Sequence, residues 1–328
     1  MSATIAPAIN PCPARPVDTP LSQAGTVHNL PLPPHLLEQR LAQSAFDITA
    51  AEEAGGGVMG AKKLTVTFRE DRRAVAAKWK KAPGGGDGWN NSPRREIGVY
   101  VVQQLFLDPT DYVVPPVVIR GIPLDTYEAV EPSPSPNLAD INCAYGALAA
   151  WMINTVQPEK AYDAELFARD PRYAYHFGNL NLLHYLTAHR DARANNFLIS
   201  EDRYNPRVFS IDNGIAFGHT LYNFFTSHFD KILVDALPRR SIERLRALRS
   251  PDLAHLSVLA ELHTDTDGIL QYTPPGPNID PDNGNRVVPG RMVQIGLTSL
   301  EIAALAERLE QLLSRIDSGE LHTEWEPD

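Results

Sequence analysis

The sequence is poor in cysteine, with only Cys12 and Cys143 among 328 residues. Two thiols cannot form a disulfide framework, and because there is no CxxC pair or histidine-rich tract, a structural zinc site is not expected. The sequence also lacks a run of about 18 apolar residues, so no membrane span is predicted. The opening residues MSATIAPAIN lack the basic region and apolar stretch of a secretory signal, so a cytoplasmic protein is expected.

Basic residues are in the minority, since 30 Lys and Arg stand against 40 Asp and Glu, giving a formal charge of −10. Binding to nucleic acid irrespective of its sequence needs clustered basic residues against phosphate, so nucleic acid is not expected as a partner. Residues 62–95 are the exception, with ten Lys or Arg against three Asp or Glu. This local excess suits a surface that faces a triphosphate, and a solvated basic face is the alternative.

Proline is abundant, with 28 residues in the chain against an average of roughly 5%. Eight of them fall within residues 1–34, which predicts a partly disordered N-terminal extension over residues 1–45, with a short helix at 35–45. Two further clusters, at 123–136 and 274–289, predict loops at 131–136 and 273–285.

The order of predicted elements divides the rest of the chain into two lobes. Residues 61–68 and 74–79 alternate apolar and polar side chains and predict a β-hairpin. Ser92 and Pro93 predict the start of a helix that runs to about residue 106. Further strands are expected at 111–122 and 143–153, and helices at 164–170, 179–189, 224–237, 241–248, 252–262 and 299–316, the last with a capping box of Thr298 and Glu301. The expected fold class is α+β, with a small β-rich lobe at 46–153 containing one helix and a larger, mainly helical lobe at 154–328.

The segment with the clearest chemical signal is HRDARANNFLI at 189–199, which fits the pattern H-R-D-x-x-x-x-N through Asp191 and Asn196. Sixteen residues after Asn196, an apolar strand ends in the triplet Asp212-Asn213-Gly214. This pair of motifs resembles the catalytic loop and the metal-binding loop of the protein-kinase-like superfamily. The alternative is a surface turn in which an aspartate caps a helix.

The resemblance implies a lysine on a strand and a glutamate on the following helix. Val75-Ala-Ala-Lys78 matches the strand motif of the family, and Glu96 lies 18 residues later at the start of the predicted helix. The family's lysine orients the α- and β-phosphates of ATP, and the glutamate holds that lysine. Lys80 is the competitor of Lys78, because alternate residues of a strand point to the same side.

A glycine cluster at residues 55–60 precedes the first clear strand. Gly57 and Gly60 are candidates to cover the phosphates of a nucleotide through backbone N–H groups. The cluster departs from the G-x-G-x-x-G pattern, and a plain flexible linker is the alternative.

Residues 179–217 resemble atypical branches of this superfamily, namely the bacterial proteins related to phosphoinositide 3-/4-kinases and the Golgi secretory-pathway kinases. The likeness extends from about residue 55 to 256. No Ala-Pro-Glu follows Asp212, so an ordinary peptide-docking activation segment is not expected, and two cysteines cannot supply the disulfides of the secretory-pathway kinases. The rival relation is to the aminoglycoside and choline kinases.

The resemblance implies an ATP-dependent phosphotransferase that uses Mg²⁺ or Mn²⁺ and a hydroxyl-bearing acceptor. Lys78, held by Glu96, would orient the phosphates, Asn196 and Asp212 would bind metal, and Asp191 would receive the proton of the acceptor hydroxyl. Two alternatives stay open: a pseudokinase or scaffold that binds nucleotide without turnover, and an enzyme of the same fold that transfers AMP. The acceptor, whether protein, lipid, sugar or small molecule, has no signal in the sequence.

Overall fold

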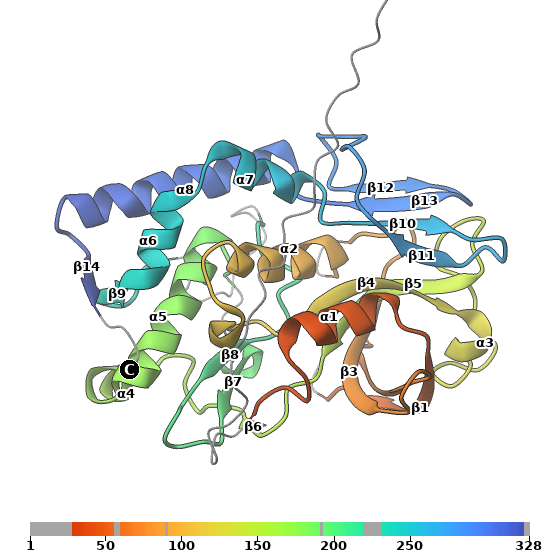
Figure 1. Cartoon of the computed structure of the whole chain (residues 1–328), viewed down its shortest axis with the longest axis horizontal. Helices are drawn as coiled ribbons and strands as arrows, with labels where there is room; N and C mark the ends of the chain where they lie inside the picture. The colour runs from red at the N-terminus through yellow and green to blue at the C-terminus, as the bar shows by residue number, and fades with distance from the viewer. Residues whose placement is uncertain (1–27, 56–59, 89–90, 191–192, 219–230, 325–328) are drawn as a thin grey trace, which may run out of the picture.

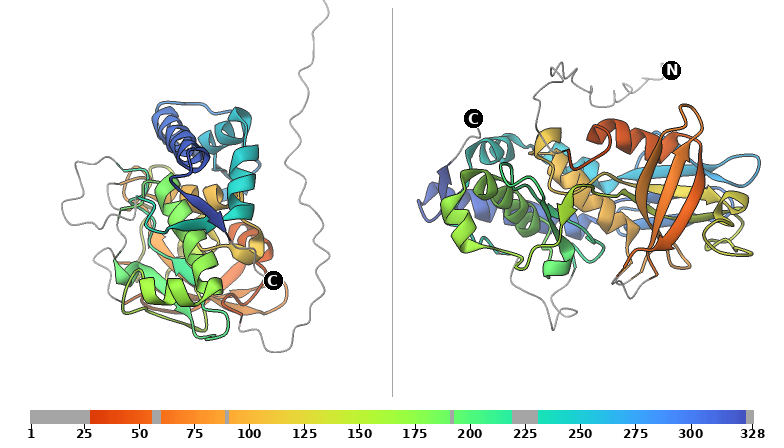
Figure 2. Two further views of the ribbon diagram at one scale, coloured as in Figure 1. Left: turned by 90° about the vertical axis from the view of Figure 1, so that its left-hand side faces the viewer. Right: turned by 90° about the horizontal axis from the view of Figure 1, so that it is seen from below.

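A computed structural model describes residues 28–55, 60–88, 91–190, 193–218 and 231–324. Most strands gather at one end of the molecule and most helices at the other, as Figure 1 and the two rotated views of Figure 2 show. The predicted α+β class is therefore confirmed. Among the described residues, the helices are too short or too polar to cross a membrane.

The largest sheet is antiparallel throughout and has the strand order β1-β2-β3-β5-β4. Its strands are β1 (Phe46–Glu53), β2 (Lys62–Phe68), β3 (Ala74–Lys81), β4 (Val117–Pro123) and β5 (Cys143–Ala150). The predicted hairpin is confirmed, since β2 and β3 pair directly with Lys63 opposite Lys78.

The two faces of this sheet enter different cores, because successive side chains of a strand point to opposite faces. Ala77 and Trp79 of β3 are buried in one core together with Leu37 and Leu41 of helix α1 (Pro34–Gln43). Trp79 also donates a hydrogen bond to the Tyr127 hydroxyl in the short helix α3 (Leu124–Tyr127). Lys78 and Lys80, at the alternate positions, therefore lie on the opposite face.

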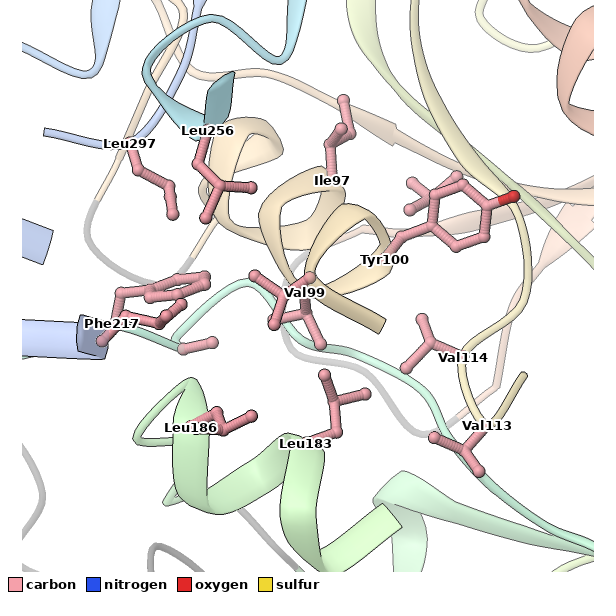
Figure 3. Close-up of a cluster of buried hydrophobic side chains, with 14 of the residues drawn as sticks. Ile97, Val99, Tyr100, Val113, Val114, Leu183, Leu186, Phe217, Leu256 and Leu297 are labelled. Carbon is pink, nitrogen blue, oxygen red and sulfur yellow. The ribbon is translucent and has the colours of Figure 1, made fainter. Parts of the chain in front are cut away.

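That opposite face is covered by helix α2 (Pro93–Gln104), which follows Ser92 with proline at its first position, as predicted. The helix is buried on nearly every side. Figure 3 shows it enclosed by apolar side chains from elsewhere in the chain, among them Leu183, Leu186, Phe217, Leu256 and Leu297. Because so many elements contact α2, the side chains that it carries have fixed positions.

The helical end of the molecule is built around α5 (Pro171–Leu186), in which every residue from Tyr173 onward is buried. The side chain of Asp170 caps its first turn. The other helices are α4 (Ala164–Arg169), α6 (Arg239–Ala247), α7 (Ser250–Ala254) and α8 (Ser299–Asp317). The predicted capping box of Thr298 and Glu301 at the start of α8 is confirmed.

Two small sheets belong to this end. One has the order β6-β7-β8 and consists of β6 (Thr155–Val156), β7 (Phe197–Ser200) and β8 (Val208–Ser210). The other is a parallel pair of β9 (Ala236–Pro238) and β14 (His322–Glu324). The three-stranded sheet matters for the site, because β7 follows the predicted catalytic loop and β8 precedes Asp212.

The prediction of a helix at 252–262 is wrong beyond its first turns. Helix α7 ends at Ala254, a 3-10 turn covers His255–Ser257, and strand β10 (Ala260–Thr264) follows. This strand is the second in a four-stranded sheet of order β11-β10-β13-β12, with β11 (Leu270–Thr273), β12 (Asn285–Val288) and β13 (Met292–Ile295). Burial of Ala260 and Leu262 and pairing with β13 override the local helical periodicity.

The second strand that replaces a predicted helix is β9. Residues 231–235 of the helix expected at 224–237 are not helical, and Ala236–Pro238 pair with β14. The remaining part of the expected helix, 224–230, lies outside the described residues.

The sheet of β10–β13 packs beside the N-terminal sheet, with β11 against β4 (Figure 1). The lobe boundary expected at 153/154 stays a prediction.

Candidate active site

Lys80 occupies a buried position on β3, where it lies opposite Ala147 of β5. Its Nζ lies 2.6 Å from Oε1 of Glu96, which is the fourth residue of α2 and is also buried. Of the two candidate lysines, Lys80 forms the contact with Glu96, whereas Lys78 was the expected partner. Both lysines point to the same face of β3, as the sequence predicts, but α2 crosses that face at the level of Lys80.

Asp212 contacts both lysines of β3. It follows β8 and forms an ion pair with Lys80, while its second oxygen lies 3.7 Å from Nζ of Lys78. The structure thus brings together four of the predicted site residues: Lys78, Lys80, Glu96 and Asp212.

Burial and the charges of neighbouring groups determine the protonation states of Asp212, Lys80 and Lys78. Burial acts to raise the pKa of Asp212, but the ammonium groups of Lys80 and Lys78 outweigh it and hold that pKa below its usual range. Burial acts to lower the pKa of Lys80, but the carboxylates of Glu96 and Asp212 raise it instead. For Lys78, burial and the neighbouring Lys80 prevail, and its pKa falls. Asp212 is therefore an anion, and Lys80 a cation, at neutral pH.

Asn196 lies in the 3-10 turn Ala194–Asn196 that leads into β7. Its carbonyl accepts a hydrogen bond of 2.9 Å from the N–H of Ile211, so the backbone of Asn196 adjoins the residue before Asp212. The side chain of Asn196 is half-buried. An amide and a carboxylate offer oxygen atoms, which are the donors that Mg²⁺ and Mn²⁺ prefer, so the predicted pair fits a hard divalent cation.

The other predicted residues are described only in part. Asp191 and Gly57 lie outside the described residues. His189, two positions before Asp191, is buried, and its ring stacks on that of His184 with centroids 4.5 Å apart. Gly60 lies at the β2 end of the connection from β1, exposed and with a φ of +64°, a conformation that favours glycine.

Three residues that the sequence did not single out as site residues join this group. The N–H of Asn213 donates to Oε2 of Glu96 at 2.9 Å, and its side chain accepts from the hydroxyl of Ser210 at 2.8 Å. Ser210 in turn bonds His184 of α5. The signal in the sequence that could have found them is the polar middle residue of the triplet at 212–214, because a buried amide requires hydrogen-bond partners.

The sheet of antiparallel strands beside a buried helix, the helical end, and the lysine–glutamate–aspartate group between them define a kinase-like fold. The crystal structure of the Golgi casein kinase is similar, with a TM-score of 0.52, 14% sequence identity and coverage of 86% of this chain and 74% of that one. A crystal structure of the Golgi casein kinase with Mn/ADP bound gives a TM-score of 0.49, 15% identity and coverage of 86% and 75%. No protein-family model matches the chain, and no curated protein matches its sequence. The likeness shows the fold, and the grouping with phosphoinositide-kinase-related proteins stays a prediction.

Proposed function

We propose that this protein is an ATP-dependent phosphotransferase that moves the γ-phosphoryl group to a hydroxyl of an acceptor. The observation that carries the proposal is the buried contact of Lys80 with both Glu96 and Asp212. A strand lysine, a helix glutamate and an aspartate after a strand are the parts that orient ATP in kinase-like enzymes. The kinase-like fold, shared with a protein named a casein kinase, supports the same reaction.

In this proposal Lys80 binds the α- and β-phosphates, and Glu96 fixes its position. Lys78 lies beside Asp212 and adds a second positive charge on the side of the phosphates. Two cations at the phosphates lower the energy of a transition state whose negative charge is spread over oxygen atoms.

Asp212 and Asn196 would hold a divalent cation, which when bound neutralises charge on the phosphates. Asp212 is suited to this because its pKa is held low and its side chain keeps 43% of its surface exposed. With nucleotide bound, the phosphates would be partners for the lysines, and the Asp212 carboxylate would be available to the cation.

Asp191 would receive the proton as the acceptor oxygen forms its bond to the γ-phosphorus. The bond between that phosphorus and the bridging oxygen breaks, and ADP leaves with the electron pair. This role rests on the motif H-R-D-x-x-x-x-N, because Asp191 lies outside the described residues.

The experiment compares binding with turnover in the full chain. In Asp212→Ala, metal-dependent binding of ATP should be lost. In Asp191→Ala, nucleotide affinity should stay near that of the wild type while turnover of labelled ATP falls by about 100-fold or more. If Asp191→Ala retains full turnover, Asp191 is not the base.

A further inference from the structure

Behind Asp212 lies a chain of three buried polar side chains. His184 of α5 contacts the Ser210 hydroxyl through Nε2 at 2.9 Å, and that hydroxyl donates to Oδ1 of Asn213 at 2.8 Å. The exposed fractions of the three residues are 0%, 0% and 2%. Because the hydroxyl hydrogen points to Asn213, the serine oxygen is an acceptor for His184, and Nε2 is the protonated nitrogen of that ring.

The backbone of Asp212 needs support. Its φ is +66°, in the left-handed region that residues other than glycine adopt only rarely. Such a conformation is strained and persists only where the surrounding structure holds it. On one side Ile211 is tied to Asn196 through its N–H, and on the other Asn213 is tied to Glu96 through its N–H.

The side chain of Asn213 adds a further hydrogen bond to this turn, and that bond depends on Ser210. Without that hydroxyl, the buried side chain of Asn213 loses a hydrogen bond, and the turn that contains Asp212 is held only by its backbone contacts. The carboxylate of Asp212 would then be held less firmly in the position in which it contacts the two lysines.

We infer that Ser210 and His184 are positioning residues: by fixing Asn213, they hold Asp212 in the conformation that binds the divalent cation. This inference rests on the proposed function, because it assigns a cation to Asp212. Groups that orient a metal ligand without touching the metal typically change its affinity by about 10- to 100-fold.

The experiment measures the dissociation constant of Mn²⁺ in the presence of a non-hydrolysable ATP analogue, from the paramagnetic resonance signal of free Mn²⁺, in the full chain. Ser210→Ala should raise that constant by about 10- to 100-fold. The matched control is Ser241→Ala, because Ser241 is also a buried serine that donates to an asparagine, Asn179, at 2.6 Å. Ser241→Ala should lower the thermal unfolding midpoint by a similar amount but leave the Mn²⁺ constant within about twofold of the wild type.

A double variant tests the route of the effect. If Ser210 acts through Asn213, then adding Ser210→Ala to Asn213→Ala should change the Mn²⁺ constant no further. An unchanged constant in Ser210→Ala, an equal shift in Ser241→Ala, or additive shifts in the double variant would each overturn the assignment. A wild type that binds no Mn²⁺ with nucleotide would instead contradict the proposed phosphotransferase, and the assignment with it.

Discussion

Lys80 and Glu96 form a buried ion pair of 2.6 Å between strand β3 and helix α2. Their side chains are 7% and 10% exposed, and removing one partner of such a pair leaves the other as an uncompensated charge. Lys78, two residues earlier on the same strand, contacts Asp212 but, among the described residues, forms no hydrogen bond or ion pair with Glu96. The two lysines therefore differ in their contacts, although strand alternation places both on the same face.

Replacing each lysine separately tests this inequality. Lys80→Met should reduce turnover of ATP by about 100-fold or more, because it removes the cation that Glu96 orients towards the phosphates. Lys78→Met should reduce it by only about five- to tenfold, since a single partly exposed ion pair contributes about 1 kcal/mol. Steady-state rates together with thermal unfolding midpoints provide the check. Equal losses of turnover in both variants, or a larger loss in Lys78→Met, would contradict the assignment of Lys80 as the main phosphate-binding lysine.

The packing of α2 predicts the effect of enlarging Gly98. A Cβ at this position would lie 3.0 Å from Leu297 Cδ2 and 3.1 Å from Phe217 Cε2, so larger side chains would push the helix away from both. Gly98→Leu should lower the free energy of unfolding by about 1 to 3 kcal/mol and reduce turnover, because α2 carries Glu96. Chemical denaturation and rate measurements on one preparation give both values. Full turnover in a destabilised Gly98→Leu would show that Glu96 keeps its position without this packing.

The ion pair between Arg94 of α2 and Glu301 of α8 predicts that the stability of the fold depends on pH. Burial acts to raise the pKa of Glu301, but the hydrogen bond and charge of Arg94 outweigh it, and that pKa lies below its ordinary value of 4.5. The unfolded state therefore binds the proton more readily, so the contribution of Glu301 to stability is present above pH 4.5 and is lost as the pH falls through the folded value.

Glu301→Gln should accordingly lower the free energy of unfolding by about 3 kcal/mol at neutral pH. The difference in the free energy of unfolding between wild type and Glu301→Gln should become smaller as the pH falls below 4.5. Denaturation at a series of pH values measures it. A difference that stays constant down to pH 3 would mean that the charge of Glu301 makes no contribution. Glutamine retains the length needed for the capping box, so helix α8 itself should persist.

Asn29 predicts how the segment before α1 contributes to stability. Its side-chain amide donates to the carbonyls of Ile153 and Asn154 and to the hydroxyl of Ser200, so it joins the segment after β5 to strand β7. Asn29→Ala should lower the free energy of unfolding by about 1 to 3 kcal/mol, because these buried acceptors lose their donor.

The control for Asn29→Ala is Gln157→Ala, which removes an exposed hydrogen bond to Asn195. That variant should change the free energy of unfolding by less than about 0.5 kcal/mol. Similar values for the two variants would show that the segment at residue 29 is dispensable.

The parts of the site that the sequence predicted are those with fixed spacing. Glu96 and Asp212 both contact Lys80, and a strand–helix motif and a strand–turn motif determine where each of the two carboxylates lies. Strand periodicity could not distinguish Lys78 from Lys80, since both point to one face and only the crossing level of α2 selects between them. Ser210 and His184 could not be found, because a buried serine and a buried histidine carry no pattern until their partner Asn213 is placed beside them.

The fold shows the same limit. The hairpin of β2 and β3 and helix α2 were predicted because their signals are local, in alternation, turns and helix starts. The sheet of β10–β13 was not, because the strand at Ala260–Thr264 pairs with Met292–Ile295, about thirty residues away, and its apolar spacing fits a short helix equally well.

The most direct test of the central claim is the fate of ATP labelled separately at the α and γ positions, with Mg²⁺ or Mn²⁺, in wild type, Asp191→Ala and Asp212→Ala. We expect the γ label on protein or in released phosphate from the wild type, and its loss in both variants. The α label on protein would contradict this account and indicate AMP transfer. If neither label appears on protein or in released phosphate although ATP binds with metal, the protein neither phosphorylates itself nor hydrolyses ATP. That result would contradict this account and favour a nucleotide-binding scaffold.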